Sequence, residues 1–291
     1  YLFSLLGRGG KGLFALDATN PATFSASNFL WEYTPAGSTT AAADADLGLM
    51  LGRPAIVKLN NGKLGFVVGN GYNSTNGLAV LYVFVLNTDG SIDQIKKIAT
   101  SVGSDNGLAG VFAVDEDGNG TADYVYGGDL KGNVWRFDIS SNNPASWGVA
   151  YSGAPLFTAK DASNNTQPIT APLYAAKNNK SGDPNFGKWF VFFGTGSYFK
   201  AGDATNTQTQ SWYGVTVEST PVSGGRASLK TRSIINVGNI GGNPSRAFSA
   251  ATAGDMTGKH GWVIDWDNPV VGERVITGSK LVQFVVPALM A

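Results

Sequence analysis

The feature that most constrains this chain is a repeated unit of short alternating segments. The apolar segments "RPAIVKL" from Arg53, "AGVFAVD" from Ala109 and "TAPLYAA" from Thr170 begin successive units, 56 and 61 residues apart. Each unit continues through a hairpin, a segment that ends in glycine, a turn and a second apolar segment. Alternation of apolar and polar residues with period two is typical of strands. Each unit therefore predicts about four strands, as in a β-propeller blade.

The composition supports the same fold class. Glycine contributes 39 of the 291 residues and aromatic residues 11%, whereas charged residues make up only 14%. This profile favours many short strands joined by tight turns over long helices. Because the repeat is longer than the repeats of WD and kelch propellers, we expect an all-β, modified β-propeller of four-stranded blades with long inter-strand loops.

The ends of the chain fit the repeat less well. Tyr1–Thr34 predicts a partial blade, and Pro221–Ala291, which contains "GWVIDW" and "KLVQFVV", predicts a final incomplete stretch. A propeller removes exposed strand edges by closing its ring. We therefore expect one propeller domain over residues 1–291 that is an incomplete portion of the ring, truncated at both ends. A two-sheet sandwich is the structural alternative.

Charge and composition exclude several classes of function. Lys plus Arg and Asp plus Glu both number 21, so the net charge of zero argues against nucleic acid as a partner. The absence of cysteine excludes disulfides, thiolate catalysis and cysteine-based metal sites. The N-terminal "YLFSLLGRGG" lacks the features of a signal peptide. The apolar tail 281–291 is far shorter than the roughly 20 residues that span a bilayer, so we expect no transmembrane segment.

An acidic loop carries the strongest functional signal. The stretch "VDEDGNGTADYVYGGDLKGNVWRFD" (residues 114–138) places four carboxylates within nine residues. Ca²⁺ binds six to eight oxygen ligands, which alternate residues of a tightly wound loop can supply. Gly118 and Gly120 allow the sharp turn. Numbered from its first aspartate, the loop offers side-chain oxygens at positions 1, 3, 5 and 9 and a main-chain carbonyl at position 7. The predicted Ca²⁺ ligands are thus Asp115, Asp117, Asn119, Thr121 (carbonyl) and Asp123.

This loop differs from a helix–loop–helix calcium site. Position 12, where an EF-hand carries a bidentate Glu, is Tyr126, and both flanks have strand patterns. The sequence therefore predicts a strand–loop–strand site with Asp123 as the bidentate ligand and with Glu116 pointing outward. The alternative is a solvated hairpin turn, because Asp, Asn and Gly are common turn formers. That alternative is favoured for the second acidic turn, residues 87–93, which has fewer ligands.

Other motifs favour structural roles. "GRGGKG" (residues 7–12) matches a dinucleotide-binding pattern, but a strand rather than a helix follows it. His260 is the only histidine, and the chain contains no G-x-S-x-G nucleophile motif, so nothing supports a Ser-His-Asp hydrolase. Asp265 and Asp267 share the end of one strand, where turn roles are favoured over glycosidase chemistry. Most of the seven tryptophans alternate within strands, which predicts core packing rather than sugar stacking.

The acidic loop and its "GDLKGNVWRFD" tail, together with "GRGGKGLFALD", "KLNNGKLGFVVGNGYNS", "FGTGSYF" and "GERVIT", resemble the C-terminal β-propeller of the PilY/PilC family. These proteins are type IV pilus biogenesis factors and tip-associated adhesins. The resemblance implies a non-enzymatic, exported protein at the pilus tip or cell surface, associated with the periplasm or outer membrane. It implies pilins or minor pilins as partners, with a host cell surface as a further candidate. In the family, a calcium-binding hairpin of this type is linked to control of pilus extension and retraction.

Two other classes of propeller share features with the chain. "GLFALDATN…LWEY" resembles the repeat of quinoprotein (PQQ-type) dehydrogenases, but the chain has no cysteine pair and its acidic loop lies on a hairpin. Integrin-α-type recognition propellers carry similar calcium loops, one on each of several blades, whereas this chain has one convincing loop. The chain also lacks an Arg-Gly-Asp tripeptide. The prediction is therefore a calcium-binding pilus protein, with a quinoprotein as the alternative.

Overall fold

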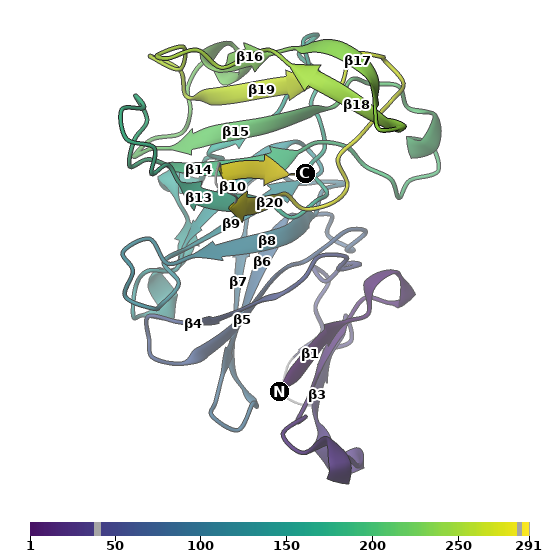
Figure 1. Cartoon of the computed structure of the whole chain (residues 1–291). Coiled ribbons are helices and arrows are strands. Elements are labelled where there is room, and N and C mark those ends of the chain that lie inside the picture. Colours follow the sequence, from purple (N-terminus) through teal and green to yellow (C-terminus); the bar gives the residue numbers. More distant parts are fainter. Residues whose placement is uncertain (38–41, 284–286, 291) are drawn as a thin grey trace. The chain divides into compact units, whose positions relative to one another are not determined.

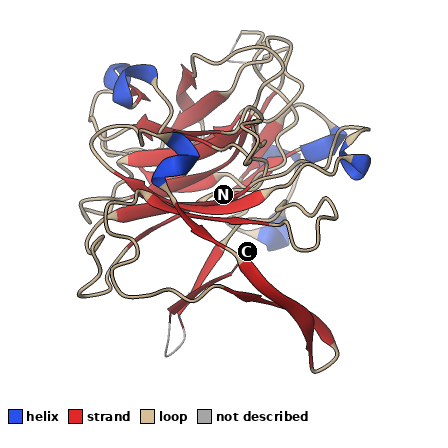
Figure 2. Ribbon diagram, turned by 90° about the horizontal axis from the view of Figure 1, so that it is seen from above, coloured by secondary structure: helices blue, strands red, loops and turns tan. Residues whose placement is uncertain are grey.

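A computed structural model of the chain describes residues 1–37, 42–283 and 287–290. The chain forms two compact units, one of residues 1–130 and 135–154 and the other of residues 131–134 and 155–291. Within the described residues, helix is limited to single 3₁₀ turns (Figure 2), and none of these is long and apolar enough to cross a membrane. The 3₁₀ turns are η1 (Gly7–Gly9), η2 (Pro21–Thr23), η3 (Ala26–Asn28), η4 (Pro144–Ser146), η5 (Tyr151–Gly153), η6 (Asp203–Thr205) and η7 (Gly225–Ser228).

The first unit contains three successive antiparallel sheets (Figure 1). The first sheet is formed by β1 (Leu2–Leu5), β2 (Leu13–Leu16) and β3 (Phe29–Tyr33). The second is a four-stranded meander of β4 (Ala55–Lys58), β5 (Leu64–Gly69), β6 (Val80–Leu86) and β7 (Ile92–Ala99). The third has the order β11-β10-β9-β8, formed by β8 (Leu108–Val114), β9 (Tyr124–Asp129), β10 (Asn133–Asp138) and β11 (Gly148–Val149). The partial first blade and the next two predicted blades are thus present as sheets.

Strand β6 explains how these sheets share a core. All seven of its residues are buried. Because successive side chains of a strand point to opposite faces, Val80, Tyr82 and Phe84 pack in a cluster with Trp31 and Tyr33 of β3. Residues 81, 83 and 85 pack instead in a second cluster, with side chains of β8, β9 and β10. The β4–β7 sheet is therefore covered on both faces, and the second cluster anchors the β8–β9 hairpin.

The second unit is built on a five-stranded sheet of order β13-β14-β15-β19-β16. Its strands are β13 (Tyr174–Lys177), β14 (Trp189–Gly194), β15 (Ser211–Val217), β19 (Gly261–Asp265) and β16 (Lys230–Arg232), the last pair being parallel. Strand β12 (Phe157–Thr158) pairs with Asn133 and Val134 of β10. Two further hairpins are formed by β17 (Ile234–Ile240) with β18 (Asn243–Phe248), and by β20 (Lys280–Gln283) with β21 (Pro287–Met290).

One assignment from the sequence is wrong. The repeat pattern assigns "GWVIDW" to the final stretch Pro221–Ala291, after the three complete units, but as β19 it pairs with β15 of the third complete blade. The two backbones approach closely at Gly214 and Gly261: a Cβ atom at Gly261 would lie 2.1 Å from the Gly214 carbonyl oxygen. Gly261 also has a φ of +134°, which L side chains rarely adopt. These two glycines allow β19 to pair along the edge that β15 would otherwise expose.

Candidate metal centre

The candidate centre lies in the nine-residue loop between β8 and β9. The hairpin register pairs Val114 with Tyr124, and the Asp123 N–H donates to the Val114 carbonyl at 2.8 Å. Gly118 and Gly120 have φ values of +80° and +88°, and a Cβ atom at either would have nothing within 4 Å. Glycine is therefore needed at both positions for its backbone conformation rather than for lack of space.

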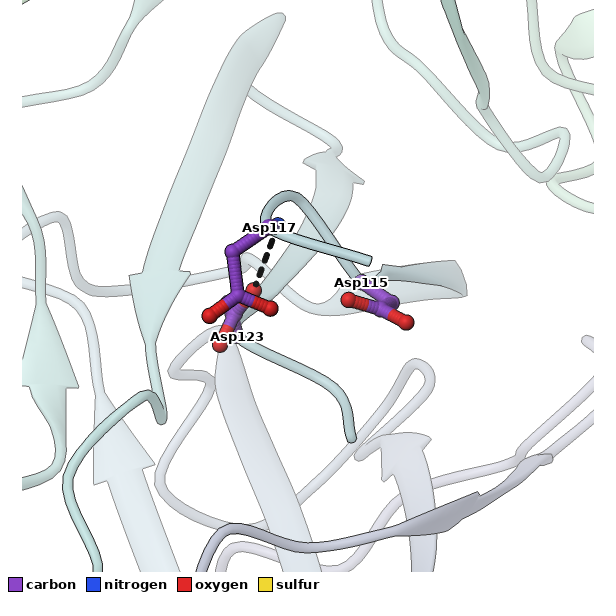
Figure 3. A group of neighbouring side chains, drawn as sticks. All are labelled: Asp115, Asp117 and Asp123. Atoms are coloured by element: carbon purple, nitrogen blue, oxygen red, sulfur yellow. Dashed lines mark hydrogen bonds between the residues drawn. The ribbon is translucent and has the colours of Figure 1, made fainter. Parts of the chain in front are cut away.

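Three of the predicted ligands converge in this loop. Carboxylate oxygens of Asp115, Asp117 and Asp123 lie within 4.8 Å of one another (Figure 3). Asp123 is buried, Asp115 is half-buried and Asp117 is exposed. Among the residues that the structure describes, this trio is the one group of three or more acidic or histidine side chains close enough to hold a metal ion. The cluster could hold a metal ion on the basis of its geometry.

Backbone N–H groups position Asp115. Its Oδ1 accepts hydrogen bonds from Gly118 at 2.7 Å and Asn119 at 3.1 Å, and its Oδ2 accepts one from Gly120 at 2.7 Å. These bonds, with that from Gly120 the largest influence, lower the pKa of Asp115. An ionised carboxylate has about four acceptor directions. Asp115 can therefore keep these bonds and still offer an oxygen lone pair to a cation.

Asp123 connects the start and the end of the loop. Its Oδ2 accepts hydrogen bonds from the N–H groups of Glu116 at 2.8 Å and Asp117 at 3.3 Å, the second drawn as a dashed line in Figure 3. Asp117 in turn accepts from the Asn119 backbone at 3.0 Å and from the Asn119 side chain at 2.9 Å. The carboxylates are thus held close together by the folded loop itself.

The other two predicted ligands lie on the outer part of the loop. The Asn119 Oδ1 accepts a hydrogen bond from the Thr121 N–H at 2.8 Å and lies 2.5 Å from the Thr121 hydroxyl oxygen. In this arrangement the Asn119 amide stabilises the turn through Thr121. Coordination by Asn119 and by the Thr121 carbonyl stays a prediction.

Asn60, in the turn between β4 and β5, supports the loop from outside and was not predicted as a site residue. Its Nδ2 donates to the Ala122 carbonyl at 3.0 Å and to Asp123 Oδ1 at 3.4 Å, and its Oδ1 accepts from the Thr121 hydroxyl at 2.8 Å. In the sequence, Asn60 belongs to the segment Asn60-Asn61-Gly62, which is typical of a turn. Its role depends on contact between residues more than 60 positions apart, for which the sequence offers no local signal.

Glu116 is turned to a different partner, in agreement with its exclusion as a ligand. Its Oε2 lies 2.7 Å from Arg136 Nη2 on β10. The Arg136 guanidinium stacks 3.6 Å from the ring centre of Tyr124 and donates to the Tyr151 hydroxyl at 3.2 Å. Glu116, the fourth carboxylate of the nine-residue loop, is therefore neutralised by Arg136, whereas the carboxylates of Asp115, Asp117 and Asp123 lie together in the loop.

The remaining polar motifs have structural partners. In the second acidic turn, Asp89 accepts from the Ser91 N–H and hydroxyl. His260 lies 3.1 Å from Glu218, and Asp265 pairs with Arg226. The strand β2 does follow "GRGGKG". Of the tryptophans, Trp31, Trp135 and Trp147 are buried in the cores of the first unit, whereas Trp189, Trp212, Trp262 and Trp266 are only half-buried.

Comparisons with known proteins agree with this architecture. The model of the PilY1 beta-propeller domain family matches residues 1–236. A type IV pilus biogenesis factor PilY1 homolog of Xylella fastidiosa is 38% identical over 275 residues, covering 89% of this chain and 18% of that protein. The type IV pilus biogenesis factor PilY1 of Pseudomonas aeruginosa strain UCBPP-PA14 is 35% identical over 236 residues, covering 74% of this chain and 19% of that protein.

A solved structure extends the match to nearly the whole chain. The crystal structure of the Pseudomonas aeruginosa PilY1 C-terminal domain superposes with a TM-score of 0.80 at 29% identity, covering 97% of this chain and 62% of that one. The chain spans about a fifth of the length of the curated relatives. The all-β, β-propeller prediction and the resemblance stated from the motifs are confirmed. This chain belongs to the PilY1 β-propeller domain family of type IV pilus biogenesis factors.

Proposed function

We propose that this chain is a calcium-responsive, non-enzymatic propeller region of a type IV pilus biogenesis factor, and that it binds one Ca²⁺ in the loop of residues 115–123. The observation that carries this proposal is the convergence of three carboxylates within 4.8 Å in a D-x-D-x-N-x-x-x-D loop. The loop supplies oxygen ligands at the alternate positions that a hard cation requires.

The ligand set favours Ca²⁺ over other common metals. All five proposed ligands offer oxygen, and none offers the sulfur or nitrogen that Zn²⁺ prefers. Mg²⁺ requires near-ideal octahedral geometry and retains several waters. A loop that combines two glycines, both at positive φ, with one buried and two more accessible carboxylates suits the larger and geometrically tolerant Ca²⁺ ion.

Calcium binding would change the energy of the loop in a defined way. Two unit charges about 4 Å apart repel each other by about 1 kcal/mol in water and about 4 kcal/mol at an effective dielectric constant of 20. A divalent cation removes this repulsion and so favours one loop conformation. Calcium then strengthens the binding of any partner that prefers the same loop conformation, and that partner strengthens calcium binding by the same coupling free energy.

In the intact protein, we propose that this linkage acts on pilus extension and retraction, and hence on twitching motility. Pilins or minor pilins at the pilus tip are the proposed partners, and the proposed location is the exported side of the cell: the pilus tip and cell surface, with the periplasm or outer membrane. A contribution to surface adhesion follows from that location. The family membership of the chain supports each of these steps.

The test is calorimetric titration of CaCl₂ into chelator-stripped chain, with MgCl₂ as the comparison ion. The parent should bind one Ca²⁺, with a Kd between about 10⁻⁷ and 10⁻³ M, and Asp123→Ala should abolish the binding heat. Asp89→Ala, in the second acidic turn, is the matched control and should bind as the parent does. Absence of binding heat and of any thermal shift in the parent would overturn the calcium assignment.

A further inference from the structure

The second unit contains an open cleft of about 1070 Å³. Ligand pockets usually measure about 300–1,000 Å³, so this cleft has room for several residues of an extended peptide. Three segments line it: the end of β12 with the turn that follows (residues 158–164), the stretch that contains η7 and the start of β16 (residues 222–231), and Lys259. These segments belong to a different unit from the acidic loop.

The lining of the cleft is cationic. Four basic side chains line it, Lys160, Arg226, Lys230 and Lys259, against a single carboxylate, Asp161. Asp161 already accepts hydrogen bonds from the N–H groups of Ser163 and Asn165, both at 2.9 Å, and from Gln208 Nε2 at 3.0 Å. Arg226 is neutralised by Asp265. The positive charge of the cleft therefore rests on the three lysines.

Among the described residues, the three lysines have no carboxylate partners of their own. Lys160 Nζ donates to the neutral Asn164 side chain at 3.1 Å, and Lys259 Nζ donates to the Ala227 carbonyl at 3.4 Å. Lys230 interacts electrostatically with Asp255, but Asp255 already accepts hydrogen bonds from both terminal nitrogens of Arg232. In the part of this unit that the structure describes, no carboxylate forms an ion pair with any of the three.

The charge of the whole unit reinforces the cleft. Residues 131–134 and 155–291 contain thirteen Lys and Arg against eight Asp and Glu, a net charge of +5. Residues 1–130 and 135–154 have eight against thirteen, a net charge of −5. The net charge of the chain is therefore zero only because the opposite net charges of the two units cancel. A cleft surrounded by positive potential concentrates anionic ligands and speeds their association.

The cleft also borders an available strand edge. Lys230 and Thr231 of β16 line it, and Thr231 is exposed. Strand β16 is the last strand of its sheet and pairs with β19 along one edge. An edge strand presents unpaired N–H and C=O groups that an extended peptide can extend as a further strand. None of the described residues that line the cleft has an aromatic ring, so the described lining offers no surface for stacking on a sugar ring.

We propose that this cleft binds an extended, acidic segment of a partner polypeptide. The main chain of the segment pairs with the free edge of β16, and its carboxylates contact Lys160, Lys230 and Lys259. Main-chain pairing provides orientation, and the lysines select for acidic sequence. This site does not depend on the calcium assignment, since calcium-free chain retains every residue that forms it.

The test is fluorescence anisotropy of a short labelled peptide of alternating Glu and Thr, titrated with the full chain. Affinity should fall as salt rises from about 50 mM to 300 mM because the charge contacts are screened. Lys160→Glu with Lys230→Glu should weaken binding by at least about tenfold. Lys177→Glu with Lys180→Glu is the matched control: it makes the same change in net charge, on exposed lysines outside the cleft. Equal weakening by both double variants would overturn the site.

Two further probes test the occupant. A peptide N-methylated at alternate residues cannot donate along one edge and should bind at least about tenfold more weakly; equal affinity would overturn the strand-pairing geometry. A heparin-derived oligosaccharide should compete weakly. If it occupies the cleft while the acidic peptide fails to bind, the peptide assignment is wrong. Circular dichroism of each variant establishes that the fold is retained.

Discussion

Glu116 Oε2 lies 2.7 Å from Arg136 Nη2, while Asp115 and Asp117, the residues on either side of Glu116, share the acidic cluster with Asp123. Adjacent side chains of the same charge therefore have opposite roles: one is paired with a cation of the protein and its neighbours are available to an external cation. The alternation arises because successive residues of the loop point in different directions. The Glu116–Arg136 ion pair therefore contributes to the stability of the hairpin, whereas the three aspartates provide its proposed metal site, and the two roles can be tested independently.

The first prediction is that Glu116→Gln lowers stability without changing calcium affinity. Arg136 has only 10% of its side chain exposed. The Gln amide oxygen can still accept a hydrogen bond from Arg136, but the carboxylate charge that faces the guanidinium is lost, and a hydrogen bond to a charged group is worth about 1 kcal/mol more than a neutral one. Chemical denaturation should detect this loss, and calorimetry should give the parent Kd for Ca²⁺. A large loss of calcium affinity would instead make Glu116 a ligand.

The second prediction concerns the buried carboxylate. Asp123→Asn preserves shape but removes one negative charge, so the Kd for Ca²⁺ should rise by at least about tenfold, equivalent to about 1.4 kcal/mol. Asp89→Asn changes the net charge identically at an exposed turn and should leave the Kd unchanged. If both variants weakened binding equally, the effect would reflect general electrostatics and not coordination.

The third prediction tests the support from the neighbouring turn. Asn60→Ala removes the hydrogen bonds to the Ala122 carbonyl and the Thr121 hydroxyl, each worth about 1 kcal/mol net. We expect a lower unfolding free energy and a weaker calcium site. Asn61→Ala, which removes only a bond to the Lys63 N–H within the same turn, is the control for calcium binding. Parent-like affinity in Asn60→Ala would show that the loop holds its geometry alone.

The fourth prediction is a pH dependence. Hydrogen bonds from Gly120, Gly118 and Asn119 lower the pKa of Asp115, so its ionisation contributes stability that is present above the unfolded-state pKa of about 3.9. That contribution is lost as pH falls through the lower pKa of the folded state. In calcium-free buffer, the difference in Tm between the parent and Asp115→Asn should be constant above about pH 5 and should shrink below about pH 4. A constant difference throughout would contradict the shift.

Most of the correctly predicted features, namely the strands of the repeat units and the acidic loop, followed from local sequence patterns. The segments that begin the three repeat units became β4, β8 and β13, and the segments that follow the acidic loop became β9 and β10. Short apolar runs bounded by turn residues predict strands whether one face or both faces are buried. The acidic loop was predictable because all its proposed ligands lie within nine consecutive residues and its two glycines favour a tight turn. The strand–loop–strand context of the loop followed from the same local signals.

Tertiary structure decided the features that depend on residues distant in sequence. The pairing of β19 with β15, the bonds from Asn60 to the loop, and the cleft that joins residues 158–164, 222–231 and 259 have no local signature. Each depends on which surfaces meet when apolar faces are buried. The sequence by itself thus determined the strands that begin each repeat unit and the acidic loop between β8 and β9. Packing decided that Asn60 supports that loop, that Glu116 is neutralised by Arg136, and that Lys160, Lys230 and Lys259 line one cleft.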